Sequence, residues 1–158
     1  MQGPTTHKSI VVTESVRTGN PNRLSMQIGG RTFIAKFEDQ DAPKTCELFR
    51  RMLPLHSSLV HCRWSGESMW VPYDPPSIPV AYENQTSYPH PGQILLYAQE
   101  MSEPEILIPY GACRFSSKVG QLAGNHFLTV IEGAEHLREV GRSILWSGAQ
   151  EIRFELMD

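Results

Sequence analysis

Two arginines lie among apolar residues close to glycines, where a guanidinium group could contact a ligand. They are Arg63 and Arg114. A guanidinium that faces a pocket can hold a carboxylate or a phosphate through two parallel hydrogen bonds. The alternative is an internal ion pair with Glu67 or Glu83, which would give the arginine a structural role. We predict Arg63, Arg114 and Glu83 as ligand-binding residues.

Aromatic residues gather in the segments that we expect at the mouth of the fold. They are Trp70, Tyr73, Tyr97, Tyr110 and Phe115. Aromatic side chains, some with polar tips, are typical of small-molecule pockets. Packing in the core or at its rim explains them about equally well, and Tyr and Trp are also enriched at subunit interfaces. We predict that Trp70, Tyr97, Tyr110 and Phe115 contact a ligand.

Two histidines and one cysteine are candidates for proton transfer or nucleophilic chemistry. His126 opens an apolar segment and could act as a general base or contact a ligand, although a structural, hydrogen-bonded histidine is favoured. His61 shares a strand face with Arg63. Cys113 lies beside Arg114, a cation that could lower its pKa. A nucleophilic cysteine needs a base such as His126, and we favour an inert, buried thiol.

No motif indicates a metal or a cofactor. Residues 132–136 (Glu-Gly-Ala-Glu-His) combine carboxylates with an imidazole at a predicted helix start, but their spacing is not that of a His-Glu-x-x-His zinc site. No cysteine–histidine pattern has zinc spacing. Phosphate-binding glycine motifs are also missing from the sequence. We therefore predict neither a metal nor a cofactor.

Composition and charge narrow the classes of partner. The 14 Lys and Arg against 17 Asp and Glu leave no basic surface for nucleic acid. Apolar runs such as residues 94–98 are far shorter than the ~18 residues of a membrane span. Residues 1–8 contain no apolar segment, and three cysteines at wide spacing are not a disulfide framework. We expect a cytoplasmic, reduced protein.

Alternating and β-branched segments predict a strand-rich fold. Glycine and proline number 12 each among 158 residues, which suits many turns rather than a helical bundle. Gly29-Gly30 is a hairpin signal. The predicted strands are residues 9–16, 23–29, 32–38, 58–71 (interrupted at Gly66), 94–98, 105–110, 126–132 and 151–157.

Two segments have helical periodicity. In the first, Asp41 is the expected cap, Pro54 ends the helix, and the apolar stripe consists of Ala42, Cys46, Phe49, Met52 and Leu53. In the second, Gly148 ends the helix and the stripe consists of Leu137, Val140, Ile144 and Leu145.

These elements predict a mainly β fold. We expect a closed antiparallel β-barrel of about eight strands, because closure removes exposed strand edges, with two helices covering the ends. We expect residues 9–158 to form one domain and residues 1–8 to form a flexible N-terminus. Residues 72–92 hold six prolines and lack clear structure, which marks a functional or mobile loop.

The order of elements, together with several motifs, resembles the cyclophilin-like barrel. The glycine-bearing residues 115–128 and the Pro-Gly-Gln-Ile entry at residues 91–94 are similar to cyclophilin segments. Trp-Ser-Gly-Glu at residues 64–67 and the run of residues 120–133 resemble more closely an uncharacterised bacterial family, a domain of unknown function with a cyclophilin-like fold. That resemblance covers residues 9–157 and implies no assigned reaction.

The resemblance to cyclophilins implies a peptidyl-prolyl isomerase as one alternative. That chemistry uses an arginine that donates to the prolyl nitrogen, and Arg63 is the best positional match. The Phe-x-x-Gln-Gly-Gly-Asp run of cyclophilins is absent, so we rank this alternative second. Our first expectation is a protein that binds a small molecule or a short peptide at the barrel mouth. A structural protein that forms homo-oligomers is the third.

Overall fold

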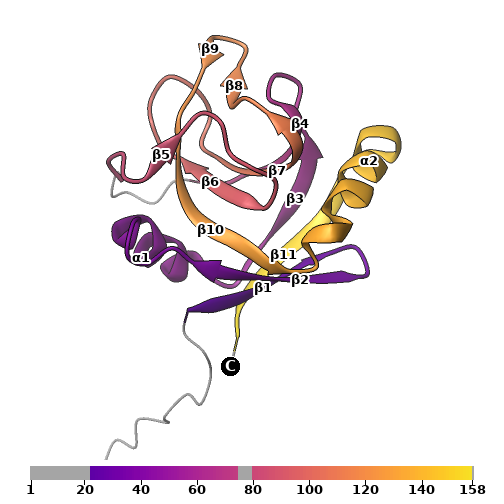
Figure 1. The fold of residues 1–158 in the computed structure, drawn as a ribbon, viewed down its shortest axis with the longest axis horizontal. Coiled ribbons are helices and arrows are strands. Elements are labelled where there is room, and N and C mark those ends of the chain that lie inside the picture. The colour runs from indigo at the N-terminus through magenta and orange to yellow at the C-terminus, as the bar shows by residue number, and fades with distance from the viewer. Residues whose placement is uncertain (1–21, 75–79, 158) are drawn as a thin grey trace, which may run out of the picture.

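The wall of the fold is built from strands whose apolar residues alternate, as the sequence predicts. The computed structural model describes residues 22–74 and 80–157, in which these strands close into a barrel (Figure 1). Its eight long strands are β1 (Arg23–Ile28), β2 (Arg31–Phe37), β3 (Leu55–His61), β4 (Gly66–Pro72), β6 (Gln93–Tyr97), β7 (Glu105–Cys113), β10 (Gly124–Glu132) and β11 (Gln150–Leu156). The mainly β, eight-stranded antiparallel barrel is therefore confirmed.

The strand order places segments distant in sequence side by side. Around the barrel it runs β2-β1-β11-β3-β4-β7-β6-β10, and the pairing of β10 with β2 closes the ring. Every pairing is antiparallel. The short β5 (Gln85–Thr86) adds to β10, while β8 (Ser116–Ser117) and β9 (Gly120–Gln121) form a separate hairpin.

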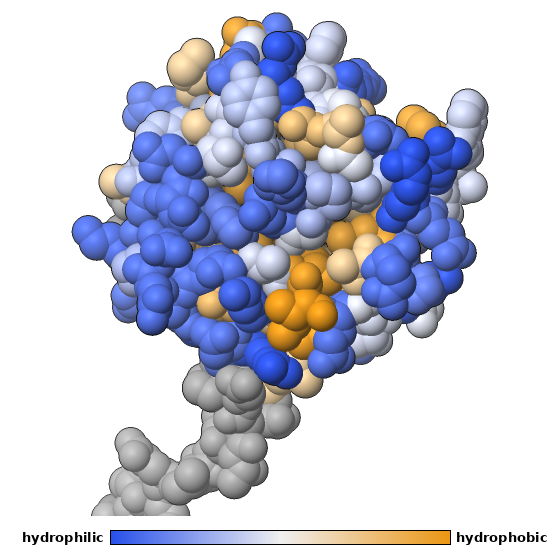
Figure 2. All heavy atoms as spheres, viewed as in Figure 1, coloured by the Kyte–Doolittle hydropathy of each residue, from blue (hydrophilic) through white to orange (hydrophobic). Residues whose placement is uncertain are grey.

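Helix α1 (Pro43–Met52) and helix α2 (Leu137–Ser147) lie on opposite sides of the barrel (Figure 1). Both contribute apolar side chains to the barrel core. Phe49 of α1 contacts the rings of Phe127 and Phe154 edge-on, with centroids 5.0 and 5.3 Å apart. A short 3₁₀ helix, η1 (Ala134–His136), leads into α2. Figure 2 shows that the surface over α1 is mostly hydrophilic, so α1 presents its apolar side to the core.

Two details of the predicted helices are wrong. Ala42 occupies the N-cap of α1, and no side chain caps it, so Asp41 does not have the expected role. Leu145 of α2 is 49% exposed. It lies about 80° around the helix axis from Leu137, outside the buried face. Gly141 lies closer to the centre of that face and is buried instead.

The predicted single strand over residues 58–71 is also wrong. It is two antiparallel strands, β3 and β4, in which Val60 pairs with Trp70. Gly66 begins β4 with a φ of +76°, and a Cβ there would lie 2.5 Å from the Ala112 carbonyl oxygen. Only glycine accepts that backbone without strain. The pairing of β4 with β7 shifts register between Gly66 and Ser68, so the predicted interruption at Gly66 is present in addition to the chain reversal at residues 62–65.

A second apolar cluster covers part of the barrel's outer surface. The strands β6 and β7 alternate between the barrel core and this cluster, so both of their faces are buried. The cluster consists of Leu95, Tyr97, Leu107, Phe115 and Leu122, with Cys62, Trp70 and Cys113 packed against it. The outer wall formed by β4, β7 and β6 is thus a second packing surface, and the site described below adjoins it.

Three further predictions concern the N-terminal residues, the cysteines and membrane-spanning helices. The predicted strand at residues 9–16 and the N-terminal tail lie outside the described residues. All three cysteines are free. Within the described residues, no helix has the length and apolar character needed to cross a membrane.

Candidate functional site

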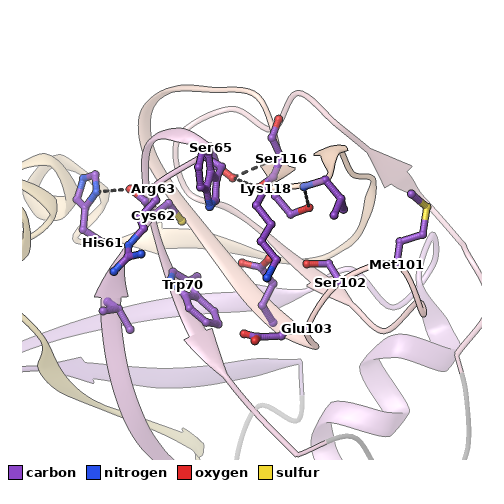
Figure 3. A pocket seen from close by; sticks show the side chains of 15 residues that line it. His61, Cys62, Arg63, Ser65, Trp70, Met101, Ser102, Glu103, Ser116 and Lys118 are labelled. Atoms are coloured by element: carbon purple, nitrogen blue, oxygen red, sulfur yellow. Dashed lines mark hydrogen bonds between the residues drawn. The ribbon is translucent and has the colours of Figure 1, made fainter.

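A cavity of about 520 Å³ opens on the outer face of the barrel wall. Apart from Trp70 of β4, its lining comes from the end of β3 and the turn after it, the segment that leads into the first residue of β7, and the β8–β9 hairpin, and Figure 3 shows these side chains from close by. The lining residues are Val60, His61, Cys62, Arg63, Trp64, Ser65, Trp70, Met101, Ser102, Glu103, Glu105, Ser116, Ser117, Lys118 and Val119. The cavity is therefore assembled from three segments far apart in sequence.

Hydrogen bonds hold two of these segments together. The Ser65 hydroxyl donates to the Ser116 carbonyl oxygen at 2.9 Å, and the Ser116 N–H donates to Ser65 Oγ at 3.1 Å. The Cys62 N–H donates to the Ser68 carbonyl oxygen at 3.0 Å and closes the turn between β3 and β4. The turn and the hairpin thus have defined positions on either side of the cavity.

Glu105 is the buried ionisable side chain of the cavity. It is the first residue of β7, is paired with Pro72 and Tyr97 across the sheet, and is only 9% exposed. Its carboxyl group makes no hydrogen bond or ion pair with any described residue. Burial raises the pKa of Glu105 to about 8, and the nearby charge of Glu103 adds to this rise. The carboxyl group is therefore mainly protonated at neutral pH.

Sequence reasoning missed Glu105. The available signal was a carboxylate at the start of the apolar run of residues 105–110, directly after Pro104. An acidic residue at a strand end is ordinarily solvated. Here the second apolar cluster extends the buried surface to that end of β7, which alternation along one strand cannot reveal.

A second polar group close to Glu105, the hydroxyl of Tyr97, is buried as well. The hydroxyl of Tyr97 is buried and makes no hydrogen bond of normal geometry among the described residues. Burial raises its pKa, and the backbone N–H groups of Met101 and Ser102 only partly oppose this rise. The hydroxyl of Tyr73 donates to the Tyr97 carbonyl oxygen at 2.8 Å. A low local dielectric strengthens any electrostatic contact made with Glu105.

Large apolar side chains form the wall and rim of the cavity. Trp70 is half-buried in the wall, and the rim residues Trp64, Met101 and Val119 are 58%, 68% and 55% exposed. Exposed apolar groups that adjoin a cavity are characteristic of a surface that binds another molecule. The arrangement can hold a flat apolar body against Trp70.

Two cations also line the cavity, and both are exposed. Figure 3 shows Lys118 extending from the β8–β9 hairpin into the cavity, while Arg63 belongs to the turn after β3. Neither makes an ion pair with a described residue. The alternative partners of Arg63 are engaged elsewhere, because Glu67 lies 3.3 Å from Arg138 and Glu83 accepts hydrogen bonds from Thr45. The predicted Arg63 and Trp70 thus come together at one cavity.

Glu83 lies at the N-terminus of α1, away from the cavity lining. Its carboxylate accepts hydrogen bonds from the Thr45 N–H at 2.6 Å and the Thr45 hydroxyl at 2.7 Å. The buried Asn125 donates to the same hydroxyl at 3.1 Å and to the Ala81 carbonyl oxygen at 3.0 Å. This network anchors the segment of residues 81–84 on α1 and β10, in place of the expected Asp41 cap.

Tyr110 lies beneath α2. The ring nitrogen Nδ1 of His61 faces the Cys62 carbonyl oxygen at 2.8 Å, and since that oxygen only accepts, Nδ1 carries the proton. The Tyr110 hydroxyl accordingly donates to Nε2 at 2.7 Å. His61 lines the cavity, so this pair connects the cavity to the packing of α2.

His126 lies on the opposite part of the wall in a polar chain. The Thr129 hydroxyl donates to Glu38 at 2.6 Å, so His126 Nε2, which lies 2.8 Å from the same hydroxyl, donates to it. Burial lowers the pKa of His126, and the nearby Glu38 opposes this. These two hydrogen bonds orient the imidazole.

The remaining predicted residues lie in the second apolar cluster or next to it in the sequence. Tyr97 and Phe115 belong to it, with their rings edge-on and 5.8 Å apart, and they back the cavity without lining it. Arg114 is exposed and does not line the cavity. Burial raises the pKa of Cys113 to about 11, as for the inert thiol that we favoured. Residues 22–74 and 80–157 contain no cluster of three or more potential metal ligands.

Solved structures share the barrel. The structure of McbB in complex with tryptophan matches with a TM-score of 0.68 and 20% sequence identity, over 84% of this chain and 44% of that one. This chain therefore spans less than half the length of McbB. The solution structure of the hypothetical protein AF2241 from Archaeoglobus fulgidus matches with a TM-score of 0.57 and 14% identity, over 89% of this chain and 98% of that one. At these identities the likeness concerns the fold alone.

No curated protein matches the chain. A family model does, and it spans residues 24–156, from the first residues of β1 to the last residue of β11. The prediction of an uncharacterised family with a cyclophilin-like barrel is confirmed by this match together with the closed barrel. The chain belongs to DUF3830, a family of proteins of unknown function.

Proposed function

We propose that this protein binds a small organic molecule in the outer-wall cavity, with Glu105 contacting the polar end of the ligand. One observation carries the proposal: a buried carboxyl group without a protein partner opens into a cavity of about 520 Å³. Buried polar groups are normally hydrogen-bonded, and a strongly shifted ionisable group in a cleft favours a functional site. A ligand would supply the missing partner.

The size and lining of the cavity agree with a small ligand. Pockets for small molecules are commonly about 300–1,000 Å³, mainly apolar, with a few convergent polar groups. Trp70 and the rim residues Trp64, Met101 and Val119 provide the apolar part. Arg63, Lys118 and Glu105 provide polar groups of both signs. The tryptophan in the McbB structure supports the choice of aromatic probes for a protein that shares its barrel.

The tryptophans of the chain provide a direct test. Of its three tryptophans, Trp64 and Trp70 line the cavity, whereas Trp146 is 83% exposed on α2. In a Trp146→Phe variant, tryptophan emission therefore reports on the cavity alone. We expect at least one of phenethylamine, phenethyl alcohol and hydrocinnamate to change this emission saturably, and none of these three probes contains an indole. If none of them does, the proposed function is wrong.

A matched substitution tests the location of binding. Replacing Trp70 by Leu removes the aromatic wall, and we expect about fivefold weaker binding, since a buried aromatic contact is worth roughly 1 kcal/mol. The control, Leu145→Ala, removes an exposed apolar side chain of α2 that does not line the cavity. Affinity should be unchanged in the control. Equal losses in both variants would contradict the proposed site.

The isomerase alternative has one observation in its favour, namely that Arg63 lines the same cavity as Trp70. A prolyl ring against Trp70 would need the guanidinium group near its nitrogen. Acceleration of proline isomerisation in a short peptide, lost in Arg63→Ala, would support this function. A wild-type protein without any acceleration would exclude it and leave the binding function intact.

A further inference from the structure

We infer that the ligand of this cavity is a small aromatic amine whose ammonium group pairs with the Glu105 carboxylate. This inference rests on the proposed function and specifies its ligand class. Four features of the described residues support it: the buried and unpaired carboxyl group, the acidic groups around it, the position of the cations, and the aromatic wall.

The first feature is the missing counter-charge. Glu105 is 9% exposed, and no cation of the described residues lies within ion-pair distance of it. A buried carboxylate without a partner is far more costly than an exposed one. By contrast, Arg63 and Lys118 are exposed and remain solvated, so their lack of partners costs little. The strongest unmet polar group in the cavity is therefore the Glu105 carboxyl group, and its ionised form calls for a cationic ligand group.

The second feature is that every group whose pKa changes through a charge interaction with Glu105, and every group that changes the pKa of Glu105 in this way, is an acid. Glu103 lies on the segment before β7, and its charge raises the pKa of Glu105. The charge of Glu105 in turn raises the pKa values of groups directly after β3 and β4 and on β6 and β7. These groups are Cys62, which directly follows the last residue of β3, and Tyr73, Tyr97 and Cys113. None of them supplies a positive charge, and each thiol or phenol is neutral at physiological pH.

The third feature explains why a carboxylate is the poorer ligand. An anion drawn to Arg63 or Lys118 would meet only solvated cations, whose interactions are weak and screened by salt. Moving deeper, it would approach Glu103 and the carboxyl group of Glu105. A positive group, in contrast to an anion, is attracted from the rim of the cavity toward the buried carboxyl group of Glu105.

The fourth feature defines the body of the ligand. Trp70 offers an aromatic face in the wall, and Trp64 another at the rim. Aromatic rings pack on one another in offset or edge-on geometries, and a cation beside an indole gains further attraction. A short linker between a ring and an ammonium group would place the ring near Trp70 and the charge at Glu105.

Pairing with an ammonium group requires Glu105 to lose its proton. Below about pH 8 the free protein holds a proton on Glu105. When an ammonium group binds, that proton leaves to solvent and the ion pair forms. No other covalent bond changes. Affinity should consequently increase with pH up to about pH 8, with a limiting slope of about tenfold per pH unit.

The test compares three probes with the same phenyl body and different end groups. Phenethylamine is a cation, phenethyl alcohol is neutral, and hydrocinnamate is an anion. In the Trp146→Phe background at pH 8, we expect phenethylamine to bind about tenfold or more tightly than either of the others, as for a charge-assisted contact. If phenethyl alcohol or hydrocinnamate binds as tightly, the inference is wrong while the proposed function stands.

Glu105→Gln provides the second arm, because it keeps the shape and removes the charge. We expect it to reduce phenethylamine affinity about tenfold, to leave phenethyl alcohol affinity unchanged, and to abolish the pH dependence. Glu151→Gln is the matched control, since that carboxylate is 85% exposed on β11. Calorimetry of the wild-type protein in buffers of different ionisation enthalpy should show one proton released. Binding of phenethylamine without proton release or without dependence on Glu105 would overturn the inference.

Discussion

Two glutamates show how the surroundings of a residue separate a structural role from a functional one. Glu83 accepts two short hydrogen bonds from Thr45 at the first turn of α1, where the helix dipole also favours an anion. Glu105 is more deeply buried and has no such donors. Both lie next to irregular segments rich in turns. The hydrogen bonds and the depth of burial distinguish them, and they assign Glu83 to the fold and Glu105 to the cavity.

The protonation of Glu105 has a measurable effect on stability. The folded protein retains this proton up to about pH 8, whereas the unfolded chain loses it near pH 4.5, the ordinary value for glutamate. Raising the pH through this window therefore lowers the free energy of unfolding, on the order of 1 kcal/mol per pH unit. Glu105→Gln should remove this contribution, so the variant should be more stable than the wild type at pH 8 and similar to it at pH 5.

Urea unfolding at several pH values measures this effect. Glu151→Gln should keep the wild-type dependence on pH, because its carboxylate is exposed. A Glu105→Gln variant with the same pH dependence as the wild type would show that Glu105 titrates normally in the folded protein.

At the scale of elements, α2 packs on the barrel through a glycine. A Cβ at Gly141 would lie 2.2 Å from one ring carbon of Tyr110, and the Tyr110 hydroxyl is held by His61 at 2.7 Å. The helix can approach the sheet this closely only because position 141 has no side chain. His61 also lines the cavity, so the packing of α2 and the position of one cavity residue depend on the same tyrosine.

Gly141→Ala should therefore destabilise the protein despite the better helix propensity of alanine. The overlap with Tyr110 costs about 1–3 kcal/mol, and the gain in propensity offsets only about 1 kcal/mol. A double-mutant cycle with Tyr110→Val should show strong coupling, since the smaller side chain leaves room for the methyl group. Ser147→Ala, at an exposed position of the same helix, should have little effect. Additive effects of the two substitutions would refute the contact.

At the scale of the whole molecule, the barrel closes its strands into a ring and leaves large apolar side chains outside. Among the described residues, Trp146 is the most exposed of these at 83%, followed by Met101 at 68% and Tyr88 at 61%. Trp146 lies on α2 and does not line the cavity. Exposed aromatic residues are frequent in interfaces, which keeps the predicted homo-oligomer open to test.

We expect the protein to sediment with a mass that is a multiple of the 17.8 kDa chain. Trp146→Ser should weaken this association, whereas Met101→Ser, which alters the cavity rim, should not. A mass of one chain at every concentration would contradict the predicted oligomer without affecting the proposed ligand site.

The sequence by itself determined the wall and both ends of the barrel. Alternation in β1, β2 and β11 and the periodicity of Phe49 and Val140 reflect local geometry, because each side chain's direction follows from its place in the strand or helix. The same logic does not extend to residues 58–71, where the chain bends at residues 63–65 and two strands replace the single predicted one.

Only the tertiary structure decided where the site lies. The cavity needs β3, β4 and β7 as neighbours, and it also needs the β8–β9 hairpin held over them by Ser65 and Ser116. Nothing in the sequence around Glu105 indicates that its carboxyl group is buried. It is buried because β6 and β7 are covered on both faces. Burial is a property of all the surrounding elements together, and it sets the protonation of Glu105 and hence the chemistry of the cavity.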